Sequence, residues 1–159
     1  MVGIQGWKGT SRNGVVNEMN ESIYYDYKVN VDFWLSADDF DLHETTKIIG
    51  MNPTDSWLKA NGKIQEYAKT CWMYSTDYQY SYAVEFQLAQ IKNVIESKIF
   101  EIREYCKKNN IDMGFTIGVR AKSFILPELI IPMSFIKFAA QLNASCIAFD
   151  IYDNLGDQF

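Results

Sequence analysis

A regular apolar stripe between residues 82 and 108 constrains the fold of this 159-residue chain more than any other feature. Apolar side chains recur there at spacings of three and four: Val84, Leu88, Ile91, Ile95, Ile99, Ile102 and Cys106. This period places them along one side of an α-helix whose opposite side is charged. At ~1.5 Å per residue the helix would be about 40 Å long, which exceeds the ~30 Å width of a small domain. We therefore expect one long helix that crosses a whole sheet or protrudes from it.

Strands are predicted on both sides of this helix. Residues 25–36, 111–120 and 146–152 alternate between apolar and polar side chains, which is typical of strands with one buried face. A further strand is predicted within residues 63–75, around Trp72. A loop is predicted from Pro53 through Trp57 to Gly62, and the cluster of Tyr78, Tyr80 and Tyr82 is interpreted as a turn.

Two short helices complete the pattern. Asp41 and Glu44 have the spacing of a capping arrangement, and Gly50 ends the helix that follows them. The second short helix begins near Ser134 and ends at Asn143. The predicted fold class is α+β: a single layered domain with a mostly antiparallel sheet of four or five strands, and one long and two short helices packed mainly on one face.

The length of the chain suits one domain with its own core. Residues 1–22 are rich in Gly, Ser, Asn and Thr and are expected to form a flexible N-terminal extension, and residues 23–159 the single α+β domain. The most apolar stretch, residues 124–136, is shorter than the ~20 residues that span a bilayer, so no membrane association is expected. Three widely spaced cysteines without a C-x-x-C pair favour the reducing cytoplasm.

Charge and composition exclude several kinds of chemistry. With one histidine and three cysteines, the chain has few of the ligands and bases that zinc frameworks and histidine-based triads use. Its net charge of −5 does not suit the basic surface that binds nucleic acid. We therefore expect no cofactor, no metal site, no catalytic residues and no nucleic-acid partner. His43 beside Glu44 is interpreted as a solvent-facing pair near a helix start. The acidic group at 38, 39 and 41 is interpreted as helix capping rather than a calcium site.

Aromatic residues occupy positions that a core does not obviously need. Trp34 lies on the polar face of the first predicted strand, and four more lie in connecting segments: Trp57, Tyr67, Tyr78 and Tyr80. Trp and Tyr combine a large contact area with a polar group and are enriched at interface hot spots. These five residues predict a partner-binding patch. The alternative is that the N-terminal extension or the Trp57 loop covers them.

Acidic residues on two strands offer a second hypothesis. Asp32 lies on the first strand, and Asp150 and Asp153 lie on or beside the last one. If these strands are neighbours, the carboxylates form a site for acid–base work. The alternative is a set of exposed aspartates on a strand face.

Several short motifs recur together along the chain. They are the 27–35 strand, the sequence Ile-Gly-Met-Asn-Pro at 49–53, the Trp72 strand, the long helix, and the sequence from Leu-Asn-Ala-Ser at 142–145 into Phe-Asp-Ile-Tyr at 149–152. In this arrangement the chain resembles the bacterial domain-of-unknown-function family 4279. The resemblance covers residues 25–153. It implies no established activity and no catalytic residue.

Three functions follow as hypotheses. The first is a non-enzymatic protein-interaction domain that binds a protein partner through an acidic, aromatic-rich surface. Small domains of this sort resemble the immunity proteins that accompany secreted bacterial toxins, so a toxin is the expected partner. The second is a small-molecule-binding domain or minor hydrolase with a carboxylate-lined pocket. The third is self-association into a homo-oligomer through a sheet edge or the long helix.

Overall fold

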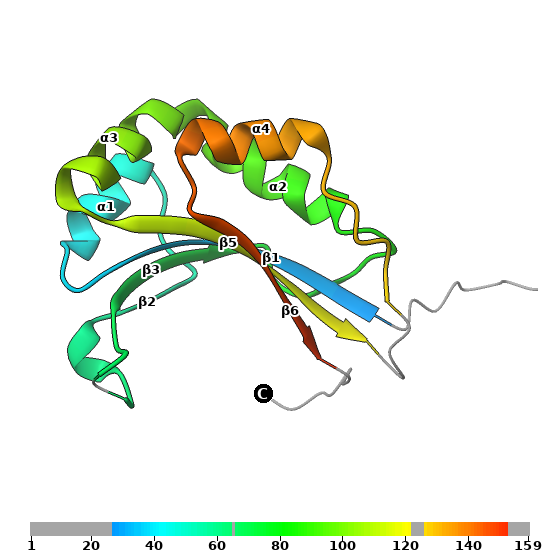
Figure 1. Ribbon diagram of the computed structural model, residues 1–159, viewed down its shortest axis with the longest axis horizontal. Coiled ribbons are helices and arrows are strands. Elements are labelled where there is room, and N and C mark those ends of the chain that lie inside the picture. The colour runs from blue at the N-terminus through cyan, green and yellow to red at the C-terminus, as the bar shows by residue number, and fades with distance from the viewer. Residues whose placement is uncertain (1–26, 65, 122–125, 153–159) are drawn as a thin grey trace, which may run out of the picture.

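A layer of helices covers one face of a curved, mixed sheet in the computed structural model, which describes residues 27–64, 66–121 and 126–152 (Figure 1). The strand order is β2-β3-β1-β5-β6, and β4 pairs with β1 beside β3. Only β5 and β6 run parallel, and the other pairs are antiparallel. The strand bounds are β1 (Tyr27–Ala37), β2 (Asp55–Trp57), β3 (Thr70–Ser75), β4 (Gln79–Tyr80), β5 (Asp112–Ala121) and β6 (Cys146–Tyr152).

This architecture confirms the predicted α+β class with helices on one face. The described part of the chain forms six strands, rather than four or five, because β2 and β4 lie in the segments interpreted as a loop and a turn. They are three and two residues long, too short to display an alternating pattern. The predicted N-terminal extension, residues 1–22, lies outside the described residues.

The helical elements are α1 (Leu42–Ile49), η1 (Lys59–Asn61), α2 (Glu85–Ile95), η2 (Glu96–Lys98), α3 (Ile99–Asn109) and α4 (Met133–Leu142). The predicted long helix is present as α2 and α3, joined by one 3₁₀ turn at η2. Because α2 packs against β1 while α3 packs against α1, this turn redirects the chain between two sets of neighbours. The apolar stripe stays buried on both sides of the turn, at Ile95 and at Ile102.

The predicted helix ends are confirmed. A side-chain oxygen of Asp41 accepts hydrogen bonds from the backbone N–H groups of His43 and Glu44, at 2.8 and 2.9 Å. Gly50 ends α1 in the left-handed region at φ 82°. Asn143 ends α4 in the same conformation, which asparagine tolerates better than most residues.

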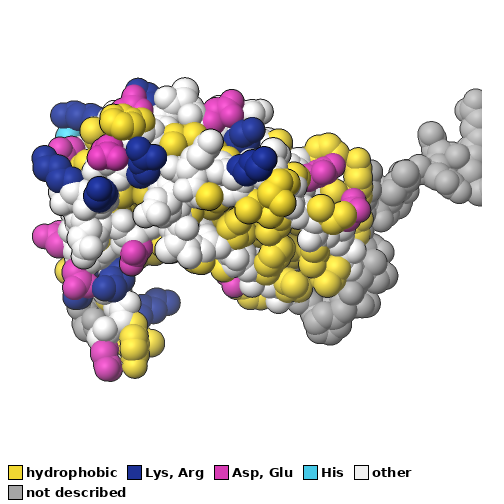
Figure 2. All heavy atoms as spheres, turned by 45° about the horizontal axis from the view of Figure 1, so that its top comes forward, with side chains coloured by type: hydrophobic (Ala, Val, Ile, Leu, Met, Phe, Trp, Pro, Cys, Tyr) yellow, Lys and Arg dark blue, Asp and Glu magenta, His cyan; other side chains and the backbone are white. Residues whose placement is uncertain are grey.

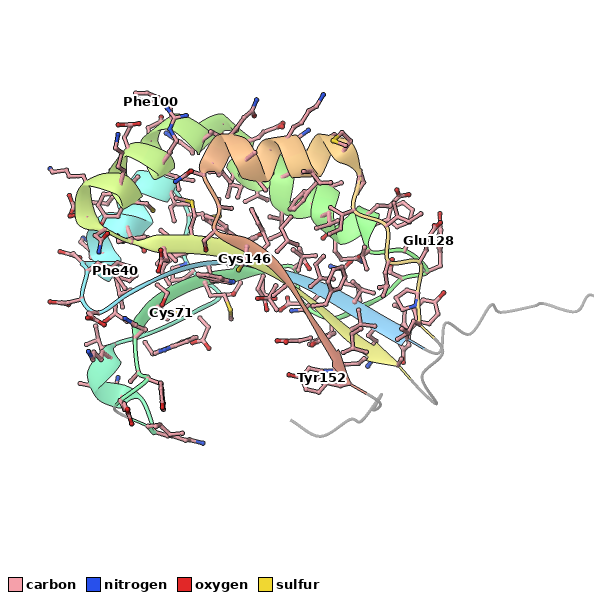
Figure 3. All side chains as sticks on the ribbon, viewed as in Figure 1. Phe40, Cys71, Phe100, Glu128, Cys146 and Tyr152 are labelled. Atoms are coloured by element: carbon pink, nitrogen blue, oxygen red, sulfur yellow. The ribbon has the colours of Figure 1, made fainter. Side chains whose placement is uncertain are left out.

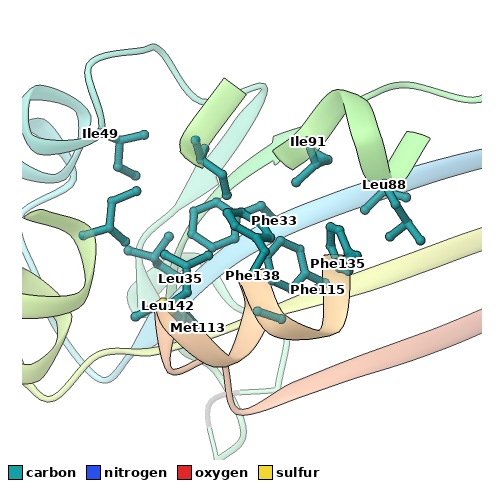
Figure 4. Close-up of a cluster of buried hydrophobic side chains, with 14 of the residues drawn as sticks. Phe33, Leu35, Ile49, Leu88, Ile91, Met113, Phe115, Phe135, Phe138 and Leu142 are labelled. Carbon is teal, nitrogen blue, oxygen red and sulfur yellow. The ribbon is translucent and has the colours of Figure 1, made fainter. Parts of the chain in front are cut away.

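Aromatic rings dominate the core between the sheet and the helices (Figure 4). Phe33 of β1 and Phe115 of β5 lie side by side with ring centroids 5.3 Å apart. Phe135 and Phe138 of α4 pack onto Phe115 at 5.0 and 6.0 Å. These contacts fix α4 over the β1–β5 pair. In the described part of the chain, no α-helix covers the opposite face of the sheet, called the outer face below; only the 3₁₀ turn η1 lies on that side (Figure 1).

The strand register determines which side chains reach the outer face. Side chains alternate between faces, so Asp32 and Trp34 of β1 point away from the core, whereas Phe33 points into it. Asp32 pairs with Thr116 of β5, and Trp34 pairs with Gly114. The outer face is therefore polar and aromatic along its central strands.

Candidate functional site

A cavity of about 540 Å³ lies on the outer face, and we call it the outer hollow. Its floor is formed by β1, β3, β5 and β6, and its wall by the end of β2 and the segment that leads into β3. In Figure 1 that wall descends below the sheet at the left. The lining residues are Asp32, Trp34, Ser36, Trp57, Tyr67, Ala68, Lys69, Cys71, Met73, Thr116 and Asp150.

Three of the five predicted aromatic residues line the outer hollow. The indole of Trp34 lies flat enough over β5 that a Cβ on Gly114 would stand 2.5 Å from its Cζ2 atom. Its Nε1–H group donates a hydrogen bond of 3.2 Å to Oγ1 of Thr116. Trp57 and Tyr67 are more open, with 38% and 75% of their surface exposed. The indole of Trp34, on the floor of the outer hollow, is thus held in place by its contacts. The aromatic rings of Trp57 and Tyr67, on the wall, are accessible from outside.

Asp32 and Asp150 both line the outer hollow, one from each strand that flanks β5. Burial raises the pKa of Asp32, and the negative charge of Asp150 raises it further, while hydrogen bonds from Ser75 and Asn30 lower it. No ion pair among the described residues involves either carboxylate. Within the described residues, Asp32 and Asp150 therefore form an acidic site without an ion-pair partner.

Asn30 donates hydrogen bonds to Asp32 and to its neighbour Ser75. Its Nδ2–H group donates to Oδ1 of Asp32 at 2.8 Å and to Oγ of Ser75 at 3.3 Å. Its own Oδ1 atom is buried without a hydrogen-bond partner among the described residues. The missing side chain of Gly118 makes room for it, because a Cβ there would stand 2.0 Å from that oxygen. Asn30 thus orients Asp32 and leaves one buried acceptor, its own Oδ1, unsatisfied within the described residues.

Two lysines near the outer hollow already form ion pairs with Asp38. Nζ of Lys69 lies 2.6 Å from Oδ1 of Asp38, and Nζ of Lys59 lies 3.4 Å from the same oxygen. These contacts lower the pKa of Asp38. Asp38 therefore balances part of the charge of Lys69, which lines the outer hollow.

The other predicted aromatic residues lie on the outer face but do not line the outer hollow. The ring of Tyr78 lies beneath the guanidinium of Arg120, with Cζ 4.1 Å from the ring centroid. The ring of Tyr80 receives Nζ of Lys28 at 4.9 Å. Each ring thus already contacts a cation of this chain, which shows that aromatic faces on this surface accept positive charge.

The other described residues that the sequence singled out do not line the outer hollow. Asp153 lies outside the described residues. His43 and Glu44 are exposed on α1, on the helix side of the sheet, and Asp41 caps that helix. Among the described residues no cluster of three or more His, Cys, Asp or Glu is arranged to hold a metal ion.

Sequence reasoning missed several lining residues, of which Thr116 and Cys71 are the most informative. Thr116 stands between two glycines on the polar face of β5, and that pattern could have marked a surface that other side chains cover. Cys71 points outward between Trp57 of β2 and Ser36 of β1 (Figure 3). Burial, together with the charges of Asp55 and Asp32, raises the pKa of its thiol to about 12. It therefore stays protonated at neutral pH and is not a nucleophile.

Comparison with known proteins identifies the family and nothing more specific. The family described as Domain of unknown function (DUF4279) matches residues 27–154, so the chain belongs to it. No curated protein and no solved structure matches the chain. Within the described residues, no helix is long and apolar enough to cross a membrane.

Proposed function

We propose that this member of the DUF4279 family is a non-enzymatic protein-interaction domain whose outer hollow binds a basic side chain of a protein partner. The observation that carries the proposal is the meeting of Asp32 and Asp150 with Trp34, Trp57 and Tyr67 around one cavity. Carboxylates form charge-assisted hydrogen bonds with ammonium and guanidinium groups. Aromatic faces attract the same cations. An arginine or lysine side chain satisfies both requirements at once.

Local charge supports this choice of ligand. Lys69 also lines the outer hollow, and its ion pair with Asp38 balances part of its charge. The net charge of −5 favours encounter with a basic partner over a nucleic acid. A bound guanidinium would also lower the pKa of Asp32, because it stabilises the ionised form.

The bacterial immunity role is the specific form of this proposal that we favour. In that role the chain occupies a basic segment of a toxin and blocks it in the cytoplasm. The described cysteines, Cys71, Cys106 and Cys146, form no disulfide among themselves, which suits a reducing compartment. The test is to examine the genes beside this one for a toxin gene, and to measure the activity of the encoded toxin with and without the chain. The lack of such a gene, or unchanged toxin activity, would contradict the immunity role.

The outer hollow itself can be tested with small cations. Arginine amide is titrated into the full chain while the fluorescence of Trp34 and Trp57 is recorded, with citrulline amide as the uncharged control. We expect dissociation constants on the order of mM for arginine amide and no saturation with citrulline amide. Asp150→Asn should weaken binding about tenfold, since one charge-assisted hydrogen bond is lost.

A matched control separates the site from the net charge. Asp112→Asn removes one exposed carboxylate from β5 outside the outer hollow and changes the net charge equally. It should leave arginine amide binding unchanged. Equal binding of arginine and citrulline amides, or equal effects of the two Asp→Asn variants, would refute the proposal.

A second candidate function is a minor hydrolase or small-molecule-binding domain that uses the same carboxylates. The raised pKa of Asp32 beside Asp150 favours it, because paired acids with separated pKa values can share acid and base roles. A cavity of about 540 Å³ also suits a small ligand. This candidate requires turnover of p-nitrophenyl esters or glycosides that both Asp32→Asn and Asp150→Asn abolish. A wild-type chain without such turnover would leave binding as the function.

A further inference from the structure

The two edges of the sheet differ in a way that concerns self-association. At one edge β2 is three residues long and carries Asp55, and short or charged edge strands resist pairing with another chain. At the other edge β6 runs for seven residues, Cys146–Tyr152, with Asp150 as its one charged residue. Proline and lysine, which commonly protect edges, are missing from β6. Within the described residues, β6 is therefore the unpaired, unprotected edge of the sheet.

An apolar surface borders this open edge on the helix side of the sheet. Phe149 and Ile151 follow the inward register of β5, opposite Ile117 and Val119, yet both are exposed because the helix layer stops short of them. Apolar side chains of α4 and of the segment before it are also exposed. We call the six residues the edge patch: Leu126, Ile130, Met133, Ile136, Phe149 and Ile151.

Figure 2 shows apolar side chains gathered over α4 and β6. At roughly half exposure the edge patch presents on the order of 500 Å² of apolar surface, which is at the upper end for a monomer. Together with seven residues of open strand it approaches the ~800 Å² that each partner buries in a standard protein interface. Two copies that bury all of it would reach the lower end of the ~1,200–2,000 Å² that specific interfaces bury in total.

We propose that the edge patch and β6 bind a second copy of this chain, with the two β6 strands antiparallel about a two-fold axis perpendicular to the sheet. Such an axis keeps both helix layers on the same face and sets residues of one face opposite residues of the same face. One register pairs all seven residues of β6, and it places Phe149 opposite Phe149 of the second copy. Ile147 then lies opposite Ile151, and Cys146 opposite Tyr152.

Repulsion between the two Asp150 carboxylates disfavours one of the other registers and so favours the same one. With Phe149 at the axis, Asp150 lies opposite Ala148, which is uncharged. A shift that brings Asp150 to the axis sets two carboxylates directly opposite each other, which destabilises a strand pair. A shift in the other direction, with Ala148 at the axis, leaves Ile151 and Tyr152 unpaired. The sequence of β6 is therefore self-complementary in one arrangement.

The test is light scattering of the full chain between about 1 and 100 μM. We expect a mass of twice 18.4 kDa at the upper concentrations. Phe149→Lys and Phe149→Glu should each raise the dimer dissociation constant about 100-fold, through lost apolar contact and like charge at the axis. An equimolar mixture of the two variants should dimerise again, because Lys then faces Glu.

Phe100→Lys and Phe100→Glu are the matched controls. Phe100 is 66% exposed on α3, on the helix side of the molecule and outside the edge patch (Figure 3), so these variants should remain dimeric. Circular dichroism checks that each variant folds. If the Phe149 variants do not fold, Ile136→Lys and Ile136→Glu on α4 replace them, and both should also weaken the dimer.

Three results would overturn the proposal. A wild-type monomer at 100 μM would leave the edge patch to another occupant, such as residues 1–26 of the same chain. Dimers that survive both Phe149→Lys and Ile136→Lys would place the interface elsewhere. Failure of the Lys and Glu variants of Phe149 to restore each other would rule out this register. Arginine amide binding in the outer hollow is measured separately, so either proposal can fail without the other.

Discussion

Gly114→Ala tests whether Trp34 is held flat across β5. In most strand positions an alanine is more favourable than a glycine by roughly 0.5–1 kcal/mol, because glycine loses more backbone entropy on folding. At Gly114, however, the new Cβ would stand 2.5 Å from Cζ2 of the indole and 3.0 Å from the backbone oxygen of Cys146. Ordinary carbon contacts begin at about 3.5 Å, so the indole must move by about 1 Å.

The cost can be worked from these contacts. Moving the indole breaks its hydrogen bond to Thr116, which contributes about 1 kcal/mol. Overpacking at a buried position adds about 1–3 kcal/mol. We therefore expect Gly114→Ala to lower the free energy of unfolding by about 2–4 kcal/mol, against a gain of up to ~1 kcal/mol if the indole were not there.

Urea unfolding followed by circular dichroism measures this difference, and a double-mutant cycle assigns it. In a Trp34→Ala background, Gly114→Ala should cost at least ~2 kcal/mol less, because the clash with the indole is gone. Thr116→Val removes the hydrogen bond alone and should cost about 1 kcal/mol. If Gly114→Ala alone leaves stability unchanged or raises it, or if its cost is the same in both backgrounds, the position we describe for Trp34 is wrong.

Two further predictions concern pH and helix capping. Because the folded state raises the pKa of Asp32 above its usual 3.8, the protonated carboxyl favours folding at low pH, and this contribution is lost as the pH rises through the raised pKa. Asp32→Asn should therefore gain stability relative to wild type between pH 3 and pH 7 in urea unfolding, and a difference that does not vary with pH would contradict this. Asp41→Ala removes the cap of α1 and should cost about 1 kcal/mol of unfolding free energy by the same assay, whereas the exposed neighbour Asp39→Ala should cost much less.

Parts of the candidate site were accessible from the sequence. The alternation around Trp34 and Asp32 indicated that both lie on the face away from the core, and the register confirms it. A meeting of Asp32 with Asp150 was predicted for the case in which their strands are neighbours. The two strands do not touch each other but flank β5, so both carboxylates still reach one cavity. The wall contributed by Trp57 and Tyr67 depended on the fold, because β2 is too short to display a pattern.

The sequence by itself determined the local features of this protein. Side-chain period depends only on the backbone of each element, so the alternation in β1, the apolar stripe of α2 and α3, and the cap at Asp41 could be recognised without knowing any neighbour. The tertiary structure decided strand order and register, because these depend on hydrogen bonds between residues far apart along the chain. That order brings Asp32 within reach of Asp150, and it leaves Phe149 exposed at an edge although its own sequence pattern is that of a buried residue.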